Sequence, residues 1–263
     1  MLVFAAHVPH SPLLIPTIGR ENSAVLKKTN EALKIVAQEL YAARPEIVIV
    51  FAGHGNPLPD AFAANLNNSF QTNLSEFGDL TTKIEYSSEL CFTDKLKRLL
   101  RQADLPFILF SDSALTYAIS VPLISLTEKL KNFTVLPIFS ANKLPIKKHF
   151  EFGQLLKEAV LSSEKRVAVI SAGDLSHALS AKAPAGLRSE GLEFDKAVRD
   201  ALKNTTASGL LQLKPETVKK SAECAYQPIV TMLGLLENIQ TKTEELCYES
   251  PFGVGYLTVR FHL

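Results

Sequence analysis

Cysteine is scarce in this sequence of 263 residues, since only Cys91, Cys224 and Cys247 occur, and these are far apart. Three scattered cysteines exclude a disulfide framework and a zinc knuckle, and they indicate a reducing compartment, so we expect a cytoplasmic protein. An excess of one charge is also missing, because 28 basic residues are balanced by 27 acidic ones. This balance gives no indication of a nucleic-acid partner.

Long apolar runs and linkers are absent too. The longest apolar stretches, such as residues 166–172, fall well short of the roughly 20 residues that a membrane-spanning helix requires, so no membrane is expected as a partner. The apolar stretch 1–16 is interrupted by two histidines and three prolines, which predicts a buried first strand rather than a signal peptide. No Pro/Gly/Ser-rich or charge-block linker divides the chain, which predicts one domain over residues 1–263.

Short apolar runs typical of strands alternate with amphipathic segments typical of helices. The expected strands are Leu2–Ala6, Glu46–Phe51, Phe107–Phe110, Thr134–Phe139, Arg166–Ser171 and Val254–Phe261. The expected helices are Ser23–Ala42, Ser88–Arg101, Ile146–Leu161 and Leu187–Leu202. The alternation predicts an α/β fold, a single domain with a mixed or largely parallel central sheet and helices on both faces.

Polar segments follow the expected strands and include four of the six histidines. His7 and His10 follow the first strand, His54 follows the second, and His177 follows a later one. Ligands of such sheets gather outside the strand ends, so we expect these loops, with segment 222–227 at a helix start, to share one crevice. Two imidazoles and one carboxylate on a metal leave open positions for substrate and oxygen, as in non-heme ferrous oxygenases.

The usual local motifs are missing, so the spacing of these residues defines a pool of candidates rather than one ligand set. There is no HExxH or CxxC, and a metal site must therefore be assembled from distant segments. There is also no GxGxxG, GxxxxGK[ST] or GxSxG, which leaves no signal for nucleotide binding or for a nucleophile elbow.

Five segments distributed over nearly the whole chain resemble, in order and spacing, the motifs of the LigB-like superfamily. They are VPHSPLLIPTIG (8–19), GHGNPLPDAF (53–62), SAGDLSHAL (171–179), AECAYQPI (222–229) and YESPFGVGY (248–256). That superfamily comprises the catalytic subunits of class III extradiol dioxygenases, the Memo proteins and the AmmeMemoRadiSam system B proteins.

The resemblance assigns roles to individual residues. It implies metal ligation by His10, His54 and the carboxylate of Glu223, with His7 as the alternative to His10. It implies that His177 is the acid/base residue and does not bind the metal. The metal that this set implies is Fe(II), with Zn or Cu as alternatives.

Two departures from the family's motifs concern Tyr117 and Cys224. Family members often have a histidine shortly before a VPL segment, whereas this chain reads LTYAISVPL and offers Tyr117, which could contact a bound substrate. Cys224 directly follows Glu223, and the Memo branch places a cysteine ligand at this point in a similar motif. Cys224 is therefore the alternative third ligand.

The sequence allows two alternative roles for each of two aspartates, Asp174 and Asp60. Asp174 either orients the imidazole of His177 or caps its own turn. Asp60 is either the N-cap of a helix that starts at Ala61 or a partner of His54.

The resemblance implies a class III extradiol ring-cleavage dioxygenase that uses non-heme Fe(II) and O2 to open a catechol-type ring. Its partners would be a small aromatic diol and dioxygen, and homo-oligomerisation stays open. The alternative is a Memo-like metal-binding redox or interaction protein without ring-cleaving activity, which Cys224 and Tyr117 favour. A zinc hydrolase is compatible with His/His/Glu ligation but has no further support in the sequence.

Overall fold

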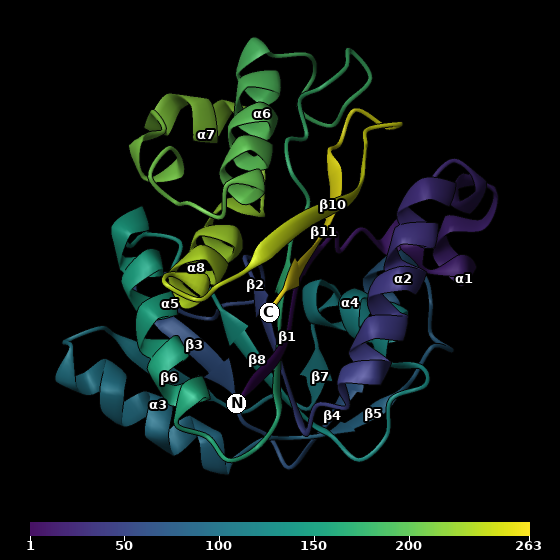
Figure 1. Cartoon of the computed structure of the whole chain (residues 1–263). Helices are drawn as coiled ribbons and strands as arrows, with labels where there is room; N and C mark the ends of the chain where they lie inside the picture. The colour runs from purple at the N-terminus through teal and green to yellow at the C-terminus, as the bar shows by residue number, and fades with distance from the viewer.

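An eight-stranded mixed sheet forms the centre of the computed structural model, which describes residues 1–263 (Figure 1). The strand order is β10-β11-β1-β9-β2-β8-β3-β6. Four neighbouring strands are parallel to one another: β1 (Leu2–Val8), β9 (Val167–Ala172), β2 (Ile47–Ala52) and β8 (Thr134–Phe139). The outer strands are β10 (Lys242–Glu249) and β11 (Tyr256–His262) at one edge and β3 (Phe62–Asn65) and β6 (Phe107–Phe110) at the other. Antiparallel pairing of β11 with β1 and of β3 with β8 makes the sheet mixed.

Helices cover both faces of this sheet, which explains why β2 and β9 are buried along their whole length. One face packs against α2 (Lys27–Ala43) and α4 (Tyr117–Thr127). The other face packs against α3 (Cys91–Gln102), α5 (Ile146–Leu161), α6 (Ser189–Lys203) and α8 (Tyr226–Leu236). Figure 1 shows the two groups on opposite sides of the strands. The predicted α/β class, with a mixed sheet and helices on both faces, is confirmed.

The remaining elements are short. They are α1 (Pro16–Gly19), α7 (Pro215–Ser221), which packs against α6, and a second sheet of β4 (Ser69–Thr72), β5 (Glu85–Ser87) and β7 (Ala114–Leu115). Among all the helices, none combines the length and the apolar character that crossing a membrane would need.

All six expected strands and all four expected helices are present, with ends that differ by a few residues. Among the elements that the sequence patterns missed are α4 and, in the central sheet, β3 and β10. Helix α4 is apolar around its whole circumference and contains Pro122, so it has no amphipathic periodicity to detect. Strand β10 is an edge strand that carries Lys242, Glu244 and Glu245, and charge of this kind is a common protection of sheet edges.

The register of the parallel strands sets the position of the polar loops. Val8 of β1 and Ala52 of β2 both lie beside Ala172 of β9, so these three strands end at the same level. His10, His54 and Asp174 each come two residues after one of these strand ends. Three distant segments therefore deliver a polar side chain to the same edge of the sheet.

Candidate metal centre

Three side chains with metal-binding atoms meet beyond the carboxyl ends of the parallel strands. One ring nitrogen each from His10 and His54 and the sulfur of Cys224 all lie within 4.8 Å of one another. The closest pair is His10 Nε2 and Cys224 Sγ, which are 3.1 Å apart. His10 is only 2% exposed, Cys224 is half-buried and His54 is exposed, so the cluster opens to solvent on the side of His54.

The segment that carries His54 needs a glycine after the histidine. Gly55 has φ +98°, which L side chains rarely adopt, and a Cβ there would lie 2.7 Å from the Thr116 side chain. Glycine thus lets the chain turn sharply after β2 and keeps His54 at the edge of the sheet.

Cys224 reaches the cluster from the turn before α8, because two glycines leave room for its backbone. A Cβ on Gly53 would lie 2.7 Å from the Cys224 carbonyl oxygen, and one on Gly173 would lie 2.8 Å from the same atom and 2.6 Å from Ala225 Cα. Such distances exclude any side chain at either position unless the backbone moves. In the sequence, Gly53 directly precedes His54 and Gly173 directly precedes Asp174. These two glycines were the only sequence signal of a close backbone approach.

Asp174 forms hydrogen bonds with the two segments that carry His10 and Cys224. Its buried carboxylate accepts a hydrogen bond from the His10 backbone N–H, with an N–O distance of 3.0 Å. Its carbonyl oxygen accepts from the Cys224 N–H at 3.1 Å, and its own N–H donates to Cys224 Sγ at 3.3 Å. Burial raises the pKa of Asp174 to about 7, against the opposing effect of the backbone donors of His10 and Ser11. The structure thus gives Asp174 contacts with the His10 and Cys224 segments, whereas the sequence left open whether it orients His177 or caps its own turn.

Glu223, the expected third ligand, lies outside the cluster. Its Oε2 accepts a hydrogen bond from the Tyr226 backbone N–H at 2.6 Å, at the start of α8. A carboxylate is favourable there because the first N–H groups of a helix have no partner within the helix. The turn points the neighbouring Cys224 towards the two imidazoles instead.

His177 lies close enough to His54 for the two imidazoles to influence each other's titration. Burial lowers the pKa of His177, and the nearby His54 lowers it further, although carbonyl groups of Leu175 and Ala222 oppose this. The ring is therefore held neutral near pH 7, and its buried Nδ1 has no hydrogen-bond partner. His177 is thus an uncharged imidazole with a free nitrogen beside the donor cluster.

Two other sequence candidates are separate from the cluster. His7 is fully buried, and its Nδ1 lies 3.0 Å from Ser171 Oγ on the neighbouring strand. Burial lowers the pKa of His7 to about 3, which keeps it neutral. Asp60 is exposed and pairs with Lys143 at 3.5 Å. No helix starts at Ala61, because the next element is strand β3, so the N-cap interpretation of Asp60 is wrong.

The donor set fits a metal ion. His10 Nε2 has the Cys224 sulfur as its hydrogen-bond partner, and burial, with the charges of Asp174 and Glu223, raises the pKa of the Cys224 thiol well above its usual range. A buried thiol of this kind stays protonated until a cation binds the sulfur, and two imidazoles with one thiolate suit zinc, copper and iron. We conclude that His10, His54 and Cys224 would hold the ion.

The family model described as the catalytic LigB subunit of aromatic ring-opening dioxygenase matches residues 4–259. The chain belongs to the LigB family. This places it among dioxygenase-like proteins, and the resemblance drawn from the five motifs is confirmed.

One curated relative of this LigB protein is Protein CA_C1420 of Clostridium acetobutylicum, 26% identical over 258 residues. The match covers 95% of this chain but 55% of the relative, so the chain spans about half the length of that protein. A crystal structure of the uncharacterized protein JW3007 from Escherichia coli K12 is similar, with a TM-score of 0.62 and 17% identity. It covers 98% of this chain and 99% of the other, and it supports the fold alone.

Proposed function

We propose that this LigB protein binds one metal ion through His10, His54 and Cys224 and has a Memo-like redox or metal-binding function. The observation that carries the proposal is the donor cluster itself, in which the sulfur of Cys224 stands where a carboxylate was expected. A thiolate is a softer donor than a carboxylate and shifts the preference from ferrous iron towards zinc or cuprous copper.

The protein's own residues would support such a centre in two ways. The Asp174 N–H donates to Cys224 Sγ, which disperses charge on a bound thiolate. The neutral His177 beside His54 can hold or release a proton near a ligand of the metal. The metal, when bound, supplies Lewis-acid or electron-transfer chemistry.

The second candidate is extradiol ring cleavage, with Fe(II), a small aromatic diol and O2. It is favoured by the description of the matching family model and by the imidazole of His177 near His54, whose pKa burial lowers. In this function His177 would accept a proton from a diol hydroxyl and return it later in the reaction, which is work suited to an imidazole with a pKa below its usual value.

Metal analysis of the wild type and three variants tests the first proposal. Anaerobic loading with Fe(II), Zn(II) or Cu(I), followed by desalting, should leave about one ion per chain in the wild type and in Glu223→Ala. His10→Ala and Cys224→Ser should lose the ion, with affinity lowered by about a hundredfold or more, because a buried ligand is removed. Loss of the ion from Glu223→Ala, together with its retention in Cys224→Ser, would overturn the proposal.

Oxygen consumption on a panel of catechols tests the second candidate. If the Fe(II)-loaded protein turns over a diol, His177→Phe should keep the iron and lose about 10²–10⁴-fold in rate, because only proton transfer is removed. A protein that retains iron and consumes no oxygen with any diol of the panel would argue against ring cleavage. The control is the same assay on Cys224→Ser, which separates loss of metal from loss of proton transfer.

A further inference from the structure

The ring of Tyr117 packs against both imidazoles of the donor cluster. Its centroid lies 5.4 Å from that of His10, in an edge-on arrangement, and 5.9 Å from that of His54. The two imidazole centroids are themselves 5.4 Å apart. The three rings therefore form a nearly equilateral triangle, in which the phenol ring lies as close to each donor as the donors lie to each other.

A second aromatic ring packs against Tyr117 and supports its position. The ring of Phe77 packs edge-on against it with a centroid distance of 5.2 Å. Phe77 lies at the end of a short 3₁₀ turn, Ser75–Phe77, and is 37% exposed. An aromatic pair of this geometry contributes about 0.5–1.5 kcal/mol beyond its area of burial, so movement of Tyr117 away from the donors is opposed.

Hydrogen bonds on both sides of Phe77 hold the segment that carries it. The nearly buried carboxylate of Asp79 accepts hydrogen bonds from the hydroxyl of Thr17, which lies in α1, and from the backbone and hydroxyl groups of Thr81 and Thr82. At the other end, the Asn73 N–H donates to the hydroxyl of Ser120 in α4. These contacts fix the position of Phe77 and, through it, that of Tyr117.

Five cavities of about 390–780 Å³ lie away from the donor cluster, and none of their lining residues belongs to it. Pockets that bury organic ligands usually have volumes of about 300 Å³ or more. A pocket of that size against both imidazoles would have to include the position that the Tyr117 ring holds.

We propose that Tyr117, backed by Phe77, determines which ligands reach the metal: it admits small ligands and excludes planar aromatic chelators. A catechol ring is about as large as the phenol ring of Tyr117 and would have to displace it to coordinate through two oxygens. An ion of a few atoms, such as azide, needs no such displacement. This inference rests on the proposed metal centre, and it makes Tyr117 the specificity-determining residue of that centre.

Binding of two probes to the cobalt(II)-loaded protein tests the inference without any assay of turnover. 4-Nitrocatechol is the planar chelator and azide is the small ligand, and both change the visible spectrum when they bind. Tyr117→Ala should bind 4-nitrocatechol about tenfold more tightly than the wild type or better, while its affinity for azide stays within about twofold. Tyr117→Phe keeps the ring and should behave like the wild type towards both probes.

Phe77→Ala is the second variant, because it removes the support and leaves Tyr117 in place. It should raise the affinity for 4-nitrocatechol, as Tyr117→Ala does, and leave the affinity for azide unchanged. A general structural defect would change both affinities. The matched control is Tyr41→Ala on α2, where the tyrosine is 55% exposed, and it should change neither affinity.

The outcomes separate the two proposals. Cobalt is measured in each protein before the probes are added, and a wild type that holds none would overturn the metal centre itself. Cobalt-loaded wild type and Tyr117→Ala with equal affinity for 4-nitrocatechol would overturn only the role of Tyr117. An equal gain for both probes in Tyr117→Ala would also overturn it, because the ring would then restrict access without regard to ligand size.

Discussion

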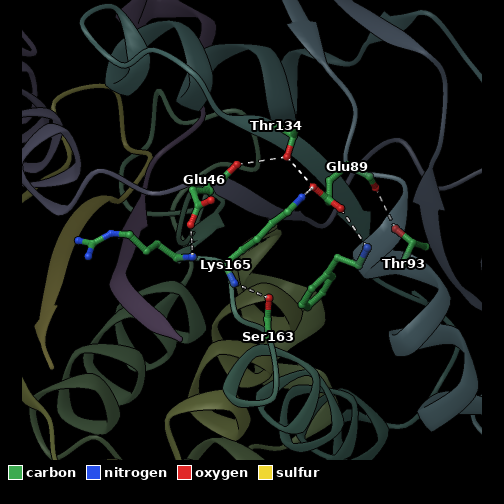
Figure 2. A network of polar contacts seen from close by, with 8 residues as sticks. Glu46, Glu89, Thr93, Thr134, Ser163 and Lys165 are labelled. Carbon is green, nitrogen blue, oxygen red and sulfur yellow. Dashed lines mark hydrogen bonds and ion pairs between the residues drawn. The ribbon is translucent and has the colours of Figure 1, made fainter.

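Two polar clusters lie at opposite ends of the same parallel strands. The carboxyl ends carry the metal-donor cluster of His10, His54 and Cys224. The amino ends carry a network around Glu89, in which one carboxylate oxygen accepts from the Phe92 N–H and the other accepts from Thr134 Oγ1 and Lys165 Nζ (Figure 2). Each cluster has a buried polar residue, His10 in one and Glu89 in the other, and each joins segments that are distant in the sequence.

The two clusters differ in whether their buried polar atoms have hydrogen-bond partners. Glu89 is 2% exposed and both of its carboxylate oxygens have donors. Around the donor cluster, Nδ1 of His10, which is the ring nitrogen not paired with Cys224, and Nδ1 of His177 have no hydrogen-bond partner. Buried polar atoms without partners cost stability, so a protein keeps them where a ligand will use them or where they serve chemistry. The network at the amino ends therefore stabilises the fold, whereas the cluster at the carboxyl ends brings together three side chains that can bind a metal ion.

The largest effect on folding should come from Glu89→Ala. It removes three hydrogen bonds from a buried carboxylate and leaves the Phe92 N–H without its acceptor, while the Thr134 hydroxyl keeps only the Glu46 carbonyl oxygen at 3.2 Å, at a cost of about 2–4 kcal/mol in the free energy of unfolding. Urea unfolding measures this loss, and metal binding should be unchanged. His10→Ala is the reciprocal variant, which should lose the metal at a smaller cost in stability. Equal behaviour of the two variants would contradict the distinction between the clusters.

A smaller effect on folding, with a clear effect on the metal, should come from Gly173→Ala. The added methyl group would meet the backbone of Cys224 and Ala225, so the turn must move and carry the sulfur with it. We expect a loss of about 1–3 kcal/mol in stability and of about tenfold in metal affinity, measured by unfolding and by competition with a chelator. Gly209→Ala is the control, because nothing lies within 4 Å of a Cβ there.

The Glu89 network should make a pH-dependent contribution to the free energy of unfolding. Burial, the largest single influence, acts to raise the pKa of Glu89, but the donors from Lys165, Phe92 and Thr134 together hold it below its usual value. A carboxylate with a lowered folded pKa stabilises the fold above its unfolded pKa of about 4.3, and this stability is lost as the pH falls through the folded pKa. The stability difference between wild type and Glu89→Gln should therefore be constant above about pH 5 and shrink below about pH 4. A difference that does not shrink as the pH falls below about 4 would be inconsistent with this account.

The smallest effect should come from Asp60→Ala. Asp60 is exposed, and its ion pair with Lys143 at 3.5 Å is a surface contact, worth at most about 0.5 kcal/mol. Metal affinity should stay within about twofold of the wild-type value, as measured by the same chelator competition. A clear loss of metal would show that Asp60 acts on His54, as one interpretation of the sequence had it.

The sequence predicted the fold well because its evidence is local. Alternation of apolar residues identified six of the eight strands of the central sheet and four of the helices, and the strand ends indicated where His10, His54 and His177 would gather. Two of the elements that it missed lack such patterns, since α4 is apolar on all sides and β10 is a charged edge strand. The choice between Glu223 and Cys224 also lay beyond it, because neighbouring residues in a turn project in different directions that no periodicity reveals.

The sequence by itself determined which chemical groups are present at the strand ends and that they belong to the LigB family's motifs. Only the tertiary structure decided which of them meet. The register of three parallel strands aligns His10, His54 and Asp174, and the absence of side chains at Gly53 and Gly173 lets the Cys224 turn pack between them. These are contacts between residues as many as 214 positions apart, and they depend on backbone geometry that the order of residues does not display.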